Sequence, residues 1–339
     1  MSLSKIPGNP LSLEAKRGLI PQEMRFHVVM AKSLRDLMSP WMVLMVALGL
    51  LPVIIFSLAW RESFRGMSLE MQTYSLVGYF MIVTFMWLAG FYLAYIISTR
   101  GVDSITKEDS EGTLLIMVSK PISRFQFILG KFLALLLTTL FLELVILFSS
   151  ILLFWGVLGL DPDTFGAVLG LVPWIFLYSI IVSLVFDSIT IAISTLLKNR
   201  VVMTVILTII IVFVFIAGMA IRLASYDTYE NYRLYYIDGG YHLGNAYTLF
   251  LDGAESGRMT PQIQAWLGIF TGTYRAGAGT VLTMFLGSPE SFDPDIGAMP
   301  PSLEKTNYVN RALSTLLCLA ASAAILGVAK VAMERKEVH

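Results

Sequence analysis

Two acidic residues, Glu143 and Asp187, lie deep inside long apolar stretches of the sequence. An ionisable side chain at membrane depth is costly, and such residues commonly carry protons or line a transport path. Neither stretch contains a Lys or Arg that could neutralise its acid. Each acid must therefore be protonated, hydrogen-bonded to neutral groups or in contact with water.

Hydroxyl side chains accompany both acids at helical spacing. Around Asp187, the polar side chains that recur every three or four residues are Ser179, Ser183, Asp187, Thr190 and Ser194. A weaker set accompanies Glu143, namely Thr139 and Ser150. The pattern favours two interpretations equally. In the first, Glu143, Ser179, Ser183, Asp187 and Thr190 line a translocation path; in the second, Ser and Thr join helices and the acids are buried and neutral.

The sequence lacks the residue sets of metal and nucleic-acid chemistry. A single cysteine, Cys318, excludes an intramolecular disulfide and a cysteine-based zinc site. The three histidines are far apart in sequence: His27, His242 and His339. The 24 Lys and Arg balance the 24 Asp and Glu, so no basic surplus draws the chain to nucleic acid. We predict no catalytic residues, no metal site and no nucleic-acid partner.

The two acids must be positioned by membrane-spanning helices. The chain has 339 residues, 56% hydrophobic and 14% charged, with a mean hydropathy of +0.73, which excludes an ordinary soluble domain. A bilayer core requires about 20 apolar residues of helix. Runs of this kind cover residues 41–60, 76–98, 132–158, 168–197, 201–221 and 312–331. The predicted fold class is an all-α integral membrane protein with six transmembrane helices.

The basic residues indicate how the spans are oriented. Lys and Arg concentrate before the first run, between the second and third, between the fourth and fifth, and after the last. By the positive-inside rule these segments and both termini are cytoplasmic, in a multi-pass protein of the cytoplasmic (inner) membrane. The predicted parts are a cytoplasmic segment 1–40, five spans in 41–221, an extracytoplasmic segment 222–311, and the last span with its tail in 312–339.

Two segments outside the spans have informative patterns. Met24, Val28, Ala31, Leu34 and Met38 recur at helical spacing, which predicts an interfacial amphipathic helix on the cytoplasmic leaflet or a simple topology anchor. The extracytoplasmic segment 222–311, or outer segment, holds most of the 14 tyrosines. They indicate either an aromatic belt with a small folded cap or a surface that grips a ligand. Residues 263–287 are apolar, but Arg275 lies at their centre among glycines. We predict two short interfacial helices there rather than a seventh span.

The connection between the second and third runs, residues 100–131, is too long for a tight turn and is rich in charge. Glu108, Asp109 and Glu111 precede an apolar block, which predicts a short helix with negative charge at its N-terminal end. Pro121 ends this helix, and the next helix begins near Ser123. We therefore expect a cytoplasmic helix-turn-helix that is suited to receiving a mechanical force from a docked cytosolic partner.

These residues resemble the first cytoplasmic loop of the permease subunits of the type-2 ABC exporter superfamily. That loop carries an acid-x-x-acid-Gly-Thr-Leu block, then Ser-x-Pro-Ile-Ser-Arg, then Gly-Lys at the membrane entry. Here the three blocks are Glu108 with Glu111-Gly112-Thr113-Leu114, then Ser119-Lys120-Pro121-Ile122-Ser123-Arg124, then Gly130-Lys131. The six-span layout agrees with the family across most of the chain.

The resemblance implies an exporter permease that pairs with a second permease copy or a sister permease, and with two copies of a separate P-loop ATPase subunit. The region 108–115 would be a coupling helix seated on the ATPase, and the turn 196–200 a smaller contact. The implied coupling residues are Glu108, Glu111, Gly112, Thr113, Leu114, Leu115, Lys198 and Asn199. ATP and Mg would be bound by the ATPase, with no cofactor on this chain.

The residues themselves support a separate ATPase. A P-loop requires the pattern G-x-x-x-x-G-K-[ST]. The only Gly-Lys pair is Gly130-Lys131, with Phe125 at the place of the first glycine and Phe132 at the place of Ser or Thr. We therefore predict that this chain is not an enzyme by itself.

Two alternatives stay open from the sequence. One is a stand-alone ion-coupled carrier that uses Glu143 and Asp187 for protons. The other is a copper-linked role, since some relatives serve copper-enzyme maturation and thioethers can bind Cu(I), although methionine is also ordinary membrane filler. The methionines near the early spans are Met38, Met42, Met45, Met67, Met71, Met81 and Met86.

Overall fold

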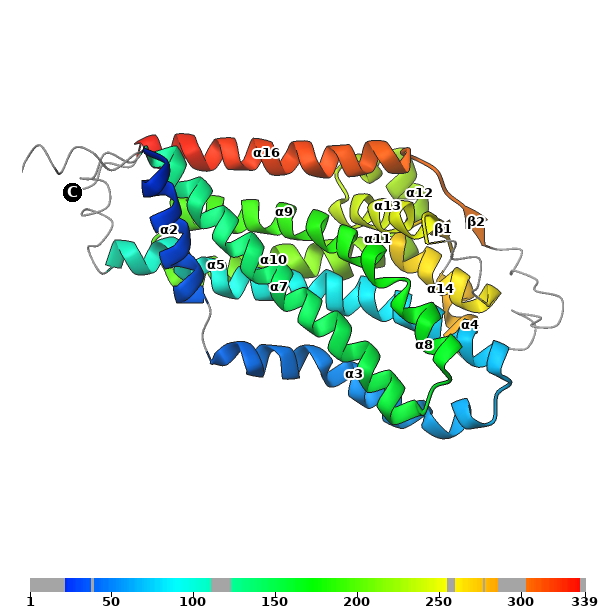
Figure 1. Cartoon of the computed structure of the whole chain (residues 1–339). Helices are drawn as coiled ribbons and strands as arrows, with labels where there is room; N and C mark the ends of the chain where they lie inside the picture. The colour runs from blue at the N-terminus through cyan, green and yellow to red at the C-terminus, as the bar shows by residue number, and fades with distance from the viewer. Residues whose placement is uncertain are drawn as a thin grey trace, which may run out of the picture.

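The computed structural model describes residues 22–37, 40–110, 123–254, 260–276, 278–285 and 303–335. Within these residues, six helical segments are long and apolar enough to cross a membrane, which confirms the predicted fold class. Their bounds are Met42–Arg65, Leu69–Val102, Arg124–Leu158, Pro162–Leu196, Arg200–Ala224 and Arg311–Arg335. The spans lie side by side as one elongated bundle (Figure 1).

Several spans are built from consecutive helical pieces. The first and third spans are α3 (Trp41–Arg65) and α7 (Arg124–Leu158), and the last is α16 (Arg311–Arg335). The second runs from α4 (Leu69–Val83) through the π-helix η1 (Thr84–Tyr92) into α5 (Leu93–Ser110). The fourth combines α8 (Pro162–Leu169) with α9 (Val172–Leu196), and the fifth combines α10 (Arg200–Val212), the π-helix η2 (Phe213–Ala217) and α11 (Gly218–Ala224).

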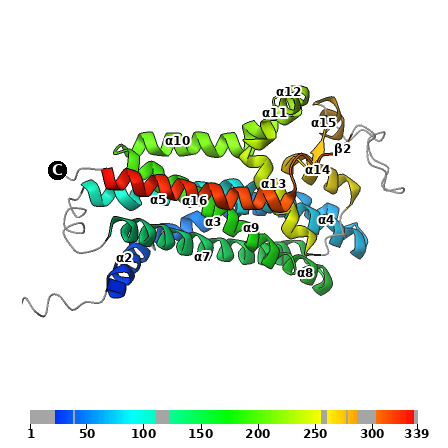
Figure 2. The same cartoon turned by 90° about the horizontal axis from the view of Figure 1, so that it is seen from above.

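Helix α9 forms the centre of the bundle. It packs against α5, α7 and α16, and it also contacts a helix of the outer segment, α13 (Gly239–Asp252). The first, fifth and last spans are mostly exposed, with 17%, 28% and 22% of their most apolar windows buried, compared with 67% for the second. Figure 2 shows α10 on one flank and α7 on the other. These exposed apolar faces suit contact with lipid.

The connection between the second and third spans differs in part from the expectation. Helix α5 continues to Ser110, so Glu108 and Asp109 lie in its last turn, and the prediction that they begin a new short helix is wrong. The continuation is permitted because no proline interrupts this segment. Helix α7 begins after Ser123, as predicted, with a capping box in which Ser123 and Gln126 satisfy each other's backbone N–H groups. Residues 111–122 lie outside the described part.

The outer segment folds around short elements. These are α12 (Tyr226–Asn231), η3 (Leu234–Tyr236), α14 (Pro261–Thr271), α15 (Ala278–Phe285) and an antiparallel pair of strands, β1 (Tyr274–Arg275) and β2 (Glu304–Lys305). Two short helices therefore flank Arg275, as predicted. Helix α2 (Gln22–Leu37) agrees with the expected N-terminal helix and packs against α7.

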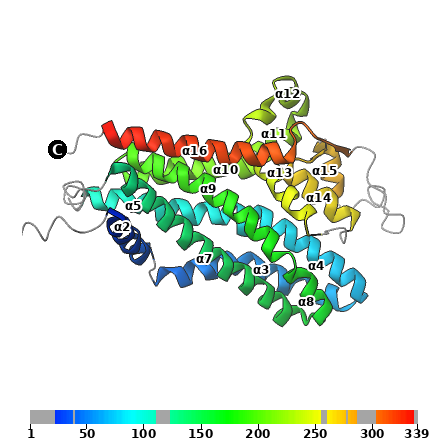
Figure 3. The same cartoon turned by 45° about the horizontal axis from the view of Figure 1, so that its top comes forward.

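One helix of the outer segment reaches into the bundle. Helix α13 packs against α9 and α16 (Figure 3). Its fully buried Tyr247 donates a hydrogen bond to the Met81 carbonyl at 2.7 Å and lies 2.7 Å from the Thr84 hydroxyl. The outer segment is therefore joined to the second span rather than resting on the membrane surface alone.

Candidate functional site

The two acids occupy the interior of the bundle, on α7 and α9. Ser179 of α9 faces the acid on α7: its hydroxyl lies 3.5 Å from Glu143 Oε1 and donates to the Ile175 carbonyl at 3.0 Å. The five residues predicted to line a path are all 0% exposed, and we call them the intramembrane polar stripe: Glu143, Ser179, Ser183, Asp187 and Thr190. The structure thus gathers the whole predicted set in the core.

Several polar atoms of the stripe have no hydrogen-bond partner within the described residues. They are Glu143 Oε2, both carboxylate oxygens of Asp187, Ser183 Oγ and Thr190 Oγ1. Most buried polar groups in folded proteins are hydrogen-bonded, and an unpaired group costs free energy. These atoms are therefore positions where a proton, a water molecule or a passing polar ligand would be stabilised.

The stripe is closed in this conformation. A Cβ atom at Gly101 of α5 would lie 2.4 Å from the methyl group of Thr190, so α5 packs tightly on that end of the stripe. On the other side, Ser322 of α16 donates to the Leu184 carbonyl and lies 3.1 Å from the Ser188 hydroxyl, which fixes α16 to α9. A path along the stripe requires these helices to separate.

A second group of contacts lies at the end of the bundle where α2, the end of α5, the start of α7 and the end of α16 meet (Figure 1). Arg124 donates through Nη1 to the carbonyls of Met333 and Glu334, both at 2.7 Å. A cation at a helix C-terminus satisfies unpaired carbonyls and complements the helix dipole. Arg124 thereby links the start of α7 to the end of α16, a contact that sequence reasoning missed.

The predicted coupling residues divide between described and undescribed parts. Glu111, Gly112, Thr113, Leu114 and Leu115 lie outside the described residues, while Glu108 lies in the last turn of α5. Lys198 and Asn199 form the turn between α9 and α10. The Asn199 side chain accepts hydrogen bonds from the N–H groups of Val201 and Val202, so it caps α10.

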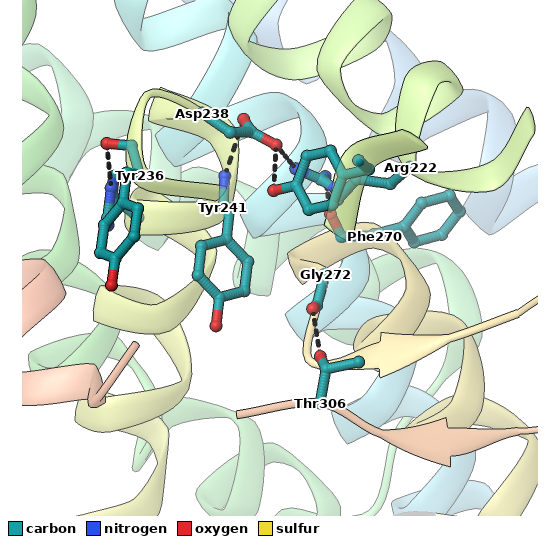
Figure 4. Close-up of polar contacts among 9 residues, drawn as sticks. Arg222, Tyr236, Asp238, Tyr241, Phe270, Gly272 and Thr306 are labelled. Atoms are coloured by element: carbon teal, nitrogen blue, oxygen red, sulfur yellow. Dashed lines mark hydrogen bonds and ion pairs between the residues drawn. The ribbon is translucent and has the colours of Figure 1, made fainter. Parts of the chain in front are cut away.

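The outer segment is organised by an ion pair that the sequence analysis did not anticipate. Arg222 at the end of the fifth span lies 2.5 Å from Asp238 Oδ2, and the two side chains are only 10% and 7% exposed. Asp238 also accepts from the Tyr229 hydroxyl at 2.9 Å and, through Oδ1, from the Tyr241 N–H at 3.1 Å (Figure 4). It therefore caps α13 and holds Arg222 at the same time.

The tyrosines of the outer segment pack on one another around this pair. Tyr308 stacks on Tyr235 at 4.8 Å and contacts Tyr229 and Tyr241 at ring distances of 6.2 and 5.9 Å. Burial, followed by the nearby Asp238 carboxylate, raises the pKa of Tyr229 well above its ordinary value, so its hydroxyl remains a donor. The four rings thus serve as a core of the folded cap.

Other contacts attach the cap to the last span. His242 Nδ1 lies 3.1 Å from the Ser314 hydroxyl, and the Asn245 amide donates to the same hydroxyl at 2.9 Å. Arg311 forms an ion pair with Asp252. Across the described ranges, no group of three or more His, Cys, Asp or Glu residues could hold a metal ion.

The fold defines a multi-pass helical membrane protein with a buried polar stripe. Residues 88–233 match the model of the ABC-2 family transporter protein, a stretch that includes the connection between α5 and α7, the stripe and Arg222. This match supports a type-2 ABC permease and confirms the resemblance seen in the sequence; it does not assign the chain to the copper-enzyme-maturation group. No curated protein shows significant similarity to the chain.

Proposed function

We propose that this chain is the membrane subunit of an ATP-driven exporter. Two copies of a separate P-loop ATPase would bind ATP and Mg, and a second permease copy or a sister permease would complete the transporter in the cytoplasmic membrane, with both termini cytoplasmic. The observation that carries the proposal is the family match over residues 88–233, which includes the connection that resembles a coupling helix.

The contacts of the described residues support a route for the movement. The ATPase would dock on residues 108–115, with Lys198 and Asn199 as a smaller contact. A displacement of the connection between α5 and α7 would move the capped start of α7. The hydrogen bonds of Arg124 would transmit this movement to the end of α16. Because α16 is fixed to α9 by Ser322 and to the cap through Ser314, its movement can open the stripe and the outer segment together.

We expect Glu143→Gln and Asp187→Asn to lower transport if the stripe lines the path. Each change keeps the shape of the side chain and removes the ionisable proton. Loss of one interaction with a charged group costs about 1.5–3 kcal/mol, which corresponds to roughly tenfold or more in rate. The measurement is transport in proteoliposomes with the partner ATPase. Glu70→Gln is the matched control, since Glu70 is an exposed acid that contacts Tyr74. Unchanged transport in both stripe variants would leave them a structural role.

A second candidate function is a stand-alone ion-coupled carrier. It is favoured by Asp187, whose two carboxylate oxygens have no partner in the described part of the chain. In that case Glu143 and Asp187 would exchange protons during transport, and no ATPase would be needed.

Affinity purification of the tagged permease from its native membrane separates the two functions. We expect mass spectrometry to identify a stoichiometric P-loop ATPase and the purified complex to hydrolyse ATP. Recovery of the permease without an ATPase, together with proton-dependent transport, would favour the carrier and reject the coupling-helix assignment.

A further inference from the structure

A groove of about 850 Å³ lies between the ends of α9 and α16, at the same end of the bundle as Arg124. This volume is within the range of about 300–1,000 Å³ that is typical of ligand pockets. The walls are mainly apolar. They include small residues, whose short side chains leave open space between the two helices. The residues that line it are Thr195, Leu196, Lys198, Ala324, Gly327, Val328, Val331, Ala332 and Arg335.

The length of the groove matches one leaflet of a bilayer. Its residues on α16 run from Ala324 to Arg335, which at 1.5 Å per residue is roughly 16 Å along the helix. The hydrocarbon core of a bilayer is about 30 Å thick, so half of it is close to this length. Val328 and Val331 are 55% and 45% exposed, so the apolar wall is open along its side.

Two cations lie where the apolar walls end. Lys198 lies two residues after the last residue of α9, and Arg335 is the last residue of α16. Neither forms an ion pair with a described residue, whereas the neighbouring Lys330 pairs with Glu334 at 3.9 Å. The groove therefore combines an apolar side wall of leaflet depth with positive charge at its mouth.

We propose that this groove binds an anionic phospholipid of the leaflet on this side. An acyl chain lies along α16 past Gly327, and the phosphate of the headgroup lies between Lys198 and Arg335. Basic pockets between transmembrane helices recognise anionic headgroups in this way. The proposal depends on the membrane-spanning fold and not on the pairing with an ATPase, and it gives the lipid a place beside the contact between Arg124 and α16.

Gly327 offers a direct way to fill the groove. Gly327 lines the groove, and a Cβ atom at this position would have no heavy atom within 4 Å, so there is open space for a larger side chain to begin. Gly156 of α7 has equally open space and does not line the groove, which makes Gly156→Phe the matched control for Gly327→Phe. Lys330→Gln is the matched control for Arg335→Gln. Lys198 is left unchanged because it also lies in the proposed ATPase contact.

The test is lipid retention by the full-length chain. Each variant is purified in detergent with equal phosphatidylglycerol and phosphatidylcholine of the same acyl chains, and the retained lipids are counted by mass spectrometry. We expect the unaltered chain to retain phosphatidylglycerol preferentially, Arg335→Gln to reduce this preference about fivefold, and Gly327→Phe to reduce retention of both lipids. Both controls should match the unaltered chain.

Three outcomes would overturn the proposal. The first is equal retention of the two lipids by the unaltered chain, and the second is unchanged retention in Gly327→Phe. The third is a change of oligomeric state in Gly327→Phe without loss of lipid, which would identify the groove as a contact between protein subunits.

Discussion

Replacing Glu111 with Lys is expected to abolish recovery of the ATPase with the permease, while the permease still inserts into the membrane. The acid belongs to the block that resembles the coupling helix. Reversing its charge at a docking surface removes the attraction to a basic group of the partner and replaces it with repulsion between like charges. Removing one partner of a buried charge pair costs about 2–5 kcal/mol, which is roughly 30-fold or more in affinity. Deletion of residues 112–115 should have the same effect.

The measurement is the ratio of ATPase to permease after affinity purification, with the permease in the membrane fraction as the reference. Asp36→Lys is the matched control, because Asp36 is an exposed acid of α2 outside the connection and undergoes the same change of charge. Normal co-purification of the Glu111→Lys and deletion variants would refute the docking role of the connection. Loss of the ATPase from the Asp36→Lys variant as well would indicate a general effect of charge at this end.

Local sequence patterns predicted much of the fold. Hydropathy located the spans because backbone in lipid must satisfy its own hydrogen bonds, which leaves long apolar helices as the solution for such a composition. The start of α7 at Ser123 and the two short helices around Arg275 followed from capping residues and from a charge among glycines. In each case the signal lay within a few residues of the feature.

Contacts between distant segments were not predictable in the same way. Both Glu143 and Ser179 were candidates, but only the packing of α7 on α9 shows that they meet. The link from Arg124 to Met333 joins residues 209 positions apart. The return of α13 into the bundle through Tyr247 also depends on the path of the whole outer segment. The spacing of residues along a single sequence does not show which distant segments lie in contact.

Asp238→Asn is expected to destabilise the folded cap by about 3–5 kcal/mol. Breaking a buried ion pair from one side leaves the other charge unpaired, and Arg222 is only 10% exposed. Asparagine caps helices as well as aspartate does, so the variant keeps the cap of α13 and removes only the charge. The measurement is thermal unfolding of the purified chain in detergent, with limited proteolysis of the outer segment as a local readout.

A double-mutant cycle tests whether the effect comes from the pair. Arg222→Met in the Asp238→Asn background removes the unpaired cation, so the double variant should recover part of the lost stability. The matched control is Glu230→Gln, which breaks the more exposed contact with Arg275 at 3.5 Å and should cost no more than about 1 kcal/mol. Additive losses at Arg222 and Asp238 would contradict the pair as the organiser of the cap. Recovery would show that the junction between the fifth span and α13 depends on one charge contact, and any movement that opens the outer segment would have to preserve or exchange it.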